Sequence, residues 1–97
     1  MINKFIILVI IIANLCLAVT ITGKVYDETN AQPLVGANVY LEDTQFGGST
    51  NIDGQYIIMD VPKNGKYTVI VKYLGYKKYT KEINVLNQES MTLDIML

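Results

Sequence analysis

Nine carboxylates are the residues of this sequence that come closest to a catalytic set. A carboxylate acts as a general acid or base only when its surroundings hold it at the reacting atom. Here the carboxylates are scattered among predicted turns and outward strand positions: Asp27, Glu28, Glu42, Asp43, Asp53, Asp60, Glu82, Glu89 and Asp94. The sequence has no histidine, and its one cysteine, Cys16, lies in an apolar N-terminal stretch. We therefore expect neither an enzymatic role nor a cofactor for this domain.

The run Asn51-Ile52-Asp53-Gly54 resembles part of a calcium-binding loop. A calcium site needs roughly six to eight oxygen ligands, and calcium loops supply them from alternating Asp or Asn residues and a distal Glu. That series of alternating oxygen ligands with a distal Glu is missing here. A tight turn explains the run, because glycine accepts a positive φ and an Asp side chain can bond to nearby backbone. We predict a hairpin turn and no metal.

A self-formed amide bond is a third kind of chemistry to weigh, as in CnaB-type domains of surface proteins. Lys24 would join Asn87 or Asp94, with Glu42 as the catalytic carboxylate. The reaction needs a lysine buried in an apolar site. The alternation of the sequence instead places Lys24 on the face opposite Val25, where water would solvate it. We expect Lys24 to remain unmodified.

Residues 1–18 are predicted to be a signal peptide. Lys4 gives a positive start, an apolar core follows over 5–19, and Cys16-Leu17-Ala18 offers a small-x-small cleavage site. We expect cleavage after Ala18. An uncleaved anchor is disfavoured, because a spanning helix needs about 20 apolar residues and a polar strand pattern begins at Thr20.

The remaining domain, residues 19–97, then has no cysteine, histidine or tryptophan, which excludes disulfides and thiol chemistry. Lipidation of Cys16 is disfavoured, since a lipoprotein signal has a small residue directly before the cysteine and Leu15 stands there. The eight lysines include Lys4, so the domain carries seven against nine carboxylates, a formal charge of −2. This mild charge and the absence of arginine argue against a nucleic-acid partner.

Alternating apolar and polar residues predict seven short strands and no helix in this domain. The strands are expected at 20–27, 37–42, 49–52, 55–61, 66–74, 77–85 and 90–97. The clearest section is 47–76, where two turns, at 51–54 and 62–65, separate three strands. Short strands with turn signals every few residues are typical of an all-β sandwich.

Several positions allow finer predictions. The change of spacing near Met59-Asp60 indicates a bulge or a strand end. Lys81 falls on the inward register of its strand, and we expect it at the rim with its stem packed and its ammonium in water. Leu34 and Val35 are expected beneath the polar loop 28–33. Most of the seven tyrosines fall on inward positions.

Glycine, proline and tyrosine residues recur at a recognisable spacing along 21–97. The matching positions are Gly23, Val25, Pro33, Leu34, Gly36, Ala37, Val39, Thr50, Asp53, Gly54, Tyr56, Gly65, Tyr67, Tyr73, Gly75 and Tyr76. This pattern resembles the carboxypeptidase regulatory-like domain. The resemblance implies a seven-stranded transthyretin-like, or prealbumin-like, β-sandwich.

The resemblance also implies a role. In this family the domain often follows the signal peptide of bacterial outer-membrane receptors that import nutrients with energy delivered by TonB. We therefore expect an exported, non-catalytic interaction or spacer module at the periplasmic face of the outer membrane, in a polypeptide that continues beyond Leu97. The alternatives are an accessory domain of a secreted metallopeptidase and a free-standing adhesion or carbohydrate-binding module.

The expected partners are another protein or the following domains of the same polypeptide, with membrane contact only through the signal peptide or a downstream barrel. The outward residues Tyr26 and Tyr40 and the edge strand Ser49, Thr50, Asn51 and Ile52 are the candidate contact surface. An exposed sheet edge can accept another strand, and tyrosine is favoured at interfaces.

Overall fold

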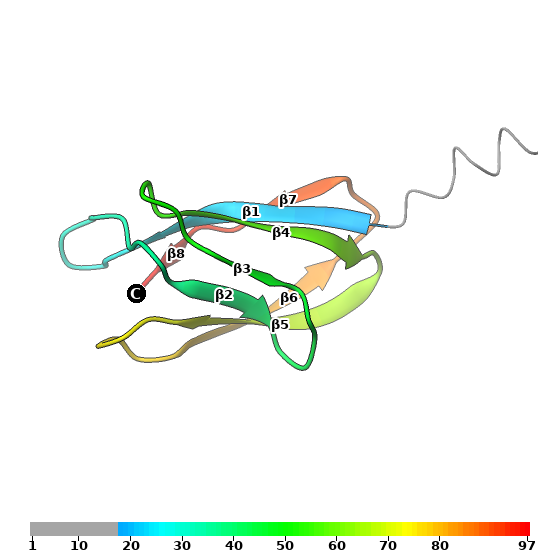
Figure 1. Cartoon of the computed structure of the whole chain (residues 1–97). Helices are drawn as coiled ribbons and strands as arrows, with labels where there is room; N and C mark the ends of the chain where they lie inside the picture. Colours follow the sequence, from blue (N-terminus) through cyan, green and yellow to red (C-terminus); the bar gives the residue numbers. More distant parts are fainter. Residues whose placement is uncertain (1–17) are drawn as a thin grey trace, which may run out of the picture.

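The computed structural model describes residues 18–97, which form a sandwich of two β-sheets (Figure 1). The strands are β1 (Ala18–Tyr26), β2 (Asn38–Leu41), β3 (Gly47–Ser49), β4 (Gln55–Pro62), β5 (Gly65–Lys72), β6 (Tyr79–Val85), β7 (Ser90–Thr92) and β8 (Ile95–Met96). The predicted signal peptide, with Cys16, lies outside the described residues except for Ala18, which begins β1. Over the described range, no helix is long and apolar enough to cross a membrane.

The first sheet is built around β1. β4 pairs with it antiparallel on one side, and β7 and β8 pair with it in parallel on the other. The second sheet has the antiparallel order β3-β2-β5-β6. Figure 1 shows β1, β4 and β7 in the upper layer and β2 and β5 in the lower one. The predicted all-β sandwich is confirmed.

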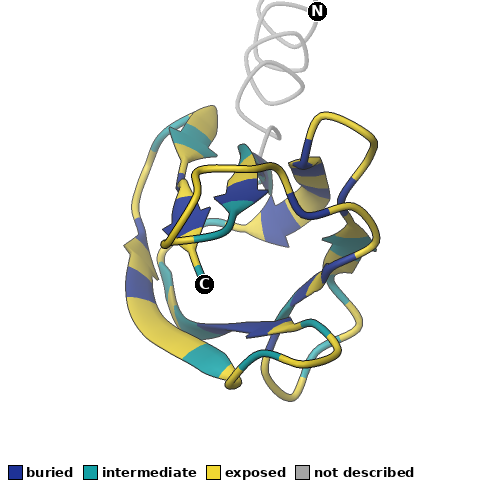
Figure 2. Cartoon of the chain, turned by 90° about the vertical axis from the view of Figure 1, so that its left-hand side faces the viewer, coloured by how far each residue is buried: buried dark blue, intermediate teal, exposed yellow. Residues whose placement is uncertain are grey.

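Alternate side chains of the two sheets meet between the layers and form the core, as the view along the sandwich shows (Figure 2). The largest fully buried side chains are Ile21, Leu41, Ile58, Ile95, Val19, Val25, Val39, Val61, Val69, Val71 and Val85. Burying a valine or isoleucine side chain contributes about 1.5–3 kcal/mol, so this β-branched core is the main stabilising feature. Its composition also explains the strands, because branched residues suit a pleated surface.

Five tyrosines predicted to face inward do so. Tyr56 is buried, and Tyr67, Tyr73, Tyr76 and Tyr79 pack against the core from partly buried positions. The Tyr56 hydroxyl donates a hydrogen bond to the Leu93 main-chain carbonyl, between β7 and β8 of the same sheet, and burial raises the pKa of this phenol. Each phenol thus fills the interior while its polar end reaches a partner or the rim.

The last predicted strand, 90–97, is split into β7 and β8 at Leu93 and Asp94. Leu93 donates its N–H to the Thr22 carbonyl, and the next N–H of β1, at Lys24, donates to the Asp94 carboxylate at 2.9 Å. The Asp94 side chain therefore replaces one rung of the backbone ladder. Gly23 makes the approach possible, because a Cβ there would lie 1.9 Å from the Leu93 carbonyl oxygen.

The predicted irregularity near Met59-Asp60 is a β-bulge. Val19 pairs with Val61 and Ile21 pairs with Ile58, so β4 has one more residue than β1 across this interval. Asp60 adopts the left-handed region, with φ of 62°. Such a bulge twists the outer edge of β4 and interrupts its pairing surface.

Lys81 lies where the sequence predicts, on the inward register of β6 opposite Val69, and is exposed. β6 is the edge of the second sheet. A charge that points inward at an edge opposes the docking of another strand, since pairing would bury its ammonium.

Two predictions about the connections are corrected. Leu34 is buried, but Val35 is 49% exposed, because Gly36 turns the chain with φ of 81° directly after it. The third strand covers Gly47–Ser49 instead of 49–52, because Asn51 already belongs to the next turn.

The chain enters the sandwich at one end and leaves it at the other (Figure 1). Ala18 lies at the right-hand end, beside the β6–β7 loop. Leu97 lies at the left-hand end, which also carries the β1–β2 loop (27–37), the β3–β4 turn (50–54) and the β5–β6 loop (73–78). We refer to this second end as the loop end.

Candidate functional site

The β3–β4 turn is closed by its own hydrogen bonds. The Asn51 side-chain oxygen accepts the N–H groups of Asp53 and Gln55 at 3.0 and 2.9 Å, and Gly54 donates its N–H to the Asn51 carbonyl at 2.9 Å. Gly54 has φ of 72°, which only glycine adopts easily. The predicted tight turn is confirmed, with Asn51 instead of Asp53 as the capping side chain, but it does not form a hairpin, because β3 and β4 belong to different sheets. No group of three or more potential metal-ligating side chains gathers within residues 18–97.

Thr50 lies in the interior and cannot serve as the surface contact predicted for it. Only 5% of this residue is exposed. Its hydroxyl donates to the Leu34 carbonyl and accepts the Ala37 N–H at 2.9 Å, so one side chain fastens β3 to the segment that precedes β2. The sequence signal for this role is a threonine where alternation puts a buried side chain, since a buried hydroxyl must find partners.

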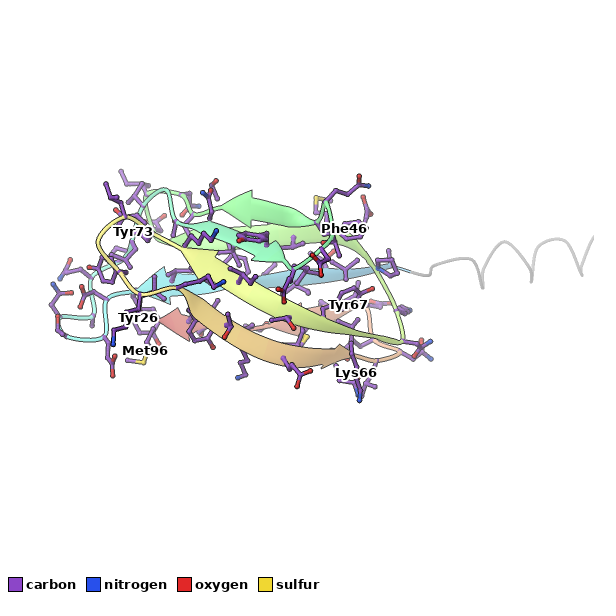
Figure 3. All side chains as sticks on the ribbon, turned by 90° about the horizontal axis from the view of Figure 1, so that it is seen from below. Tyr26, Phe46, Lys66, Tyr67, Tyr73 and Met96 are labelled. Carbon is purple, nitrogen blue, oxygen red and sulfur yellow. The ribbon has the colours of Figure 1, made fainter. Side chains whose placement is uncertain are left out.

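The other members of the predicted surface do not lie on one face. Tyr40 lies on β2, in the second sheet, between Gly47 and Ile70 of the neighbouring strands. Tyr26 lies on β1, in the first sheet, beside Met96 of β8. Both phenols point outward as predicted, but from opposite outer faces of the sandwich. Figure 3 shows Tyr26 and Met96 near the loop end.

The predicted edge strand is partly covered by the other sheet. A Cβ on Gly48 would lie 2.7 Å from the Ile57 carbonyl oxygen of β4, and a Cβ on Gly47 would lie 2.7 Å from the Tyr40 Cβ. Glycines therefore let β3 pack tightly at the seam between the sheets. Ser49, Asn51 and Ile52 remain exposed, and Ile52 is 78% exposed at the turn. Their role as contacts stays a prediction.

The groups considered for an amide bond are not brought together. Lys24 is exposed, as predicted, and the Asp94 carboxylate accepts the main-chain N–H of Lys24 instead of meeting its ammonium. Asn87 accepts a hydrogen bond from the Lys63 ammonium at 3.3 Å. Glu42 follows β2 in the other sheet. A buried lysine, the first requirement of the reaction, is missing at position 24.

Sequence analysis missed a connection between two loops at the loop end. The Tyr76 hydroxyl, on the β5–β6 loop, donates to the Asp27 carboxylate, which also accepts the hydroxyl and the N–H of Thr29. These donors, the Thr29 hydroxyl first, lower the pKa of Asp27 to about 2. The same bond to Asp27 raises the pKa of Tyr76. Nothing in the spacing of residues 49 positions apart indicates this contact.

Of the exposed apolar residues at the loop end, sequence analysis predicted only Ile52 as a contact. Val35, Ile52, Leu74 and Met96 are exposed there, and Leu74 is 97% exposed. Tyr73 and Tyr76 lie behind Leu74 with their rings edge to face at 5.4 Å. The signal was present in the Leu74-Gly75 pair, which is typical of a turn, whereas the alternation placed Leu74 at the end of a strand. This end therefore combines fixed loops with exposed apolar side chains.

Comparison of the sequence with known protein families identifies the family of this domain. The family profile described as CarboxypepD_reg-like domain matches residues 21–97, from β1 to the last residue. The chain belongs to the CarboxypepD_reg-like domain family. The predicted resemblance is thereby confirmed. No curated protein matches the sequence.

Solved structures resemble this CarboxypepD_reg-like domain in fold. A chain of a type II cohesin–X-dockerin complex from Acetivibrio cellulolyticus is 26% identical with a TM-score of 0.63; the alignment covers 80% of this chain and 56% of that one, about half its length. The dioxygenase domain of a carbohydrate-binding fusion protein from Streptomyces sp. SirexAA-E is 15% identical (TM-score 0.63, coverage 84% and 79%). A DUF3823 family protein from Parabacteroides merdae is 13% identical (TM-score 0.52, coverage 81% and 45%). The last two identities show the shared fold alone.

Proposed function

We propose that this domain is a non-catalytic periplasmic interaction or spacer module, the N-terminal extension of a TonB-dependent outer-membrane receptor for nutrient uptake. The observation that carries the proposal is membership of the CarboxypepD_reg-like family over 21–97, directly behind a predicted signal peptide. In that arrangement the receptor plug and barrel follow Leu97, and the domain lies in the periplasm.

The path of the chain supports a module inserted between other parts. The described residues enter at one end of the sandwich and leave at the other (Figure 1). A segment attached to each end would be held apart by the length of β1, along which β7 and β8 run in the same direction. The core is closed by packing and hydrogen bonds within residues 18–97, where no buried side-chain polar atom lacks a partner.

A role in holding a protein partner is supported by the likeness to a chain of a cohesin–X-dockerin complex at 26% identity. The exposed residues Ser49, Asn51 and Ile52 and the outward Tyr26 and Tyr40 are the proposed contacts. Tyrosines on two opposite faces suit neighbours on both sides of the sandwich better than one extended binding platform.

The coding sequence beyond codon 97 tests the proposal directly. A plug and β-barrel would support it, a zinc-peptidase domain would favour the accessory-domain alternative, and a stop codon would favour a free-standing module. A receptor lacking residues 19–97 should still reach the outer membrane but should lose partner-dependent uptake. Unchanged uptake in that deletion would refute the interaction role.

A further inference from the structure

The β5–β6 loop presents one leucine at the apex of a tight turn. The Tyr76 N–H donates to the Tyr73 carbonyl at 3.1 Å, and Gly75 has φ of 87°. This is the geometry of a type II β-turn with Leu74 at its first central position. We call residues 72–78 the hairpin tip. Its leucine is 97% exposed and has no packing role in the domain.

The base of the hairpin tip is fixed to the body of the domain. Tyr73 and Tyr76 meet edge to face at 5.4 Å and pack against the core. The Tyr76 hydroxyl is hydrogen-bonded to Asp27 on the β1–β2 loop. Figure 3 shows Tyr73 at the end of the sandwich that also carries Tyr26 and Met96. Leu74 is therefore presented by an ordered turn, and little conformational entropy remains to be lost when it binds.

The charges on the hairpin tip all have one sign. Lys72, Lys77 and Lys78 are exposed, and residues 72–78 include no carboxylate. Lys72 and Lys78 line a shallow hollow beside Leu74. Asp27 lies behind the tip, where hydrogen bonds from Thr29 and Tyr76 keep its carboxylate ionised, so its negative charge offsets part of the positive charge of the tip. Screening over about 8 Å at physiological salt makes these local lysines count more than the weak net charge of the chain.

We propose that the hairpin tip docks on an anionic phospholipid surface, with Leu74 entering the boundary between headgroups and acyl chains. The hairpin tip exposes one leucine, which offers much less surface than the whole area of about 800 Å² that each partner contributes to a typical stable protein interface. At a lipid interface, by contrast, each kind of side chain on the tip meets a favourable environment. The leucine enters the apolar layer, tyrosines lie at headgroup level, and lysines meet the lipid phosphates.

The expected binding is weak and reversible. Each lysine near an anionic surface strengthens binding about fivefold, and burial of a leucine strengthens it at least about tenfold. Together they give an association constant on the order of 10³ to 10⁴ M⁻¹, similar to that of a single myristoyl chain. Binding of this strength is measurable by co-sedimentation with vesicles at millimolar lipid.

The purified protein is incubated with vesicles of phosphatidylcholine and phosphatidylglycerol at a ratio of about 7:3, and with phosphatidylcholine vesicles alone. The wild type should co-sediment with the anionic vesicles and lose binding at high salt. Leu74→Ser should weaken binding at least about tenfold, and the double variant Lys77→Gln/Lys78→Gln about 25-fold. Leu86→Ser is the matched control, because Leu86 is exposed on the β6–β7 loop at the opposite end.

A second measurement uses the absence of tryptophan from the sequence. Leu74→Trp and Leu86→Trp each introduce a single fluorophore at an exposed position. Anionic vesicles should shift the emission of the first to shorter wavelength and leave the second unchanged. Circular dichroism melts of all variants check the fold, which exposed substitutions should preserve.

Four results would overturn the proposal: no binding of the wild type to anionic vesicles, equal binding to neutral vesicles, full binding by Leu74→Ser, or tryptophan emission from the Leu74→Trp variant that stays at its value in water. The first of these, together with capture of a defined protein through Leu74, would instead make the tip a protein contact.

Discussion

Replacement of Thr50 by valine removes one hydroxyl from the interior and leaves the shape of the side chain almost unchanged. The Ala37 N–H, at a fully buried residue, then loses its acceptor, and the Leu34 carbonyl loses a donor. An unsatisfied buried polar group costs about 1–3 kcal/mol, and the added methyl returns less than about 1 kcal/mol. We expect Thr50→Val to lower the free energy of unfolding by about 2 kcal/mol.

In a domain of about 80 residues this change corresponds to a fall in melting temperature of roughly 10 °C. Urea unfolding at 25 °C, followed by circular dichroism, gives the free energy, and hydrogen exchange should show a faster Ala37 amide. Thr50→Ser is the matched control, since it keeps both hydrogen bonds and should cost only about 1 kcal/mol for its lost methyl. A valine variant within about 0.5 kcal/mol of the wild type, or more stable than the serine variant, would refute the reasoning.

Three further predictions concern the first sheet, the loop end and the sheet edge. Gly23→Ala should destabilise the domain by about 3 kcal/mol in thermal melts, because its Cβ would overlap the Leu93 carbonyl; a neutral effect would contradict the proposed close approach. The pKa of Asp27 is lower in the folded chain, about 2, than in the unfolded chain, about 3.9, so the unfolded state binds more protons as the pH falls from 4 to 2. The melting temperature of the wild type should therefore fall more steeply in this window than that of Asp27→Asn. If the two melting temperatures fall in parallel, Asp27 makes no such contribution to stability. Lys81→Val should promote self-association through the β6 edge, visible by analytical ultracentrifugation, and a strictly monomeric variant would show that the charge has no protective role.

The fold could be predicted from the sequence because each strand of a sandwich is indicated by residues that are close together in the chain. The alternation around Val39, Val69 and Val71 indicates the core face, and the residue types from Asn51 to Gly54 indicate a tight turn. The bulge at Asp60 was visible as a break in the same alternation. These features need no knowledge of distant residues.

Three of the missed features depend on residues far apart in the chain. Asp94 cannot be recognised as a substitute rung of the ladder until β1 lies beside it, 70 positions away. The polar residues around Thr50 predict a surface position, whereas its hydroxyl bonds to the Leu34 carbonyl, 16 positions away in the sequence. Tyr76 and Asp27 meet only when the β5–β6 and β1–β2 loops reach the same end. The candidate site was predicted poorly for this reason, since a surface is a product of the assembled layers.

The parallel pairing of the first and last strands has a mechanical consequence. When the two ends of the domain are pulled apart, β1 and the β7–β8 segment are drawn in opposite directions along their common axis. The bonds from Thr20, Lys24, Leu93 and Leu97 that join them are then loaded together in shear, instead of opening one after another. A domain built in this way should resist tension along its length better than force applied across its sheets, because no single bond carries the whole load.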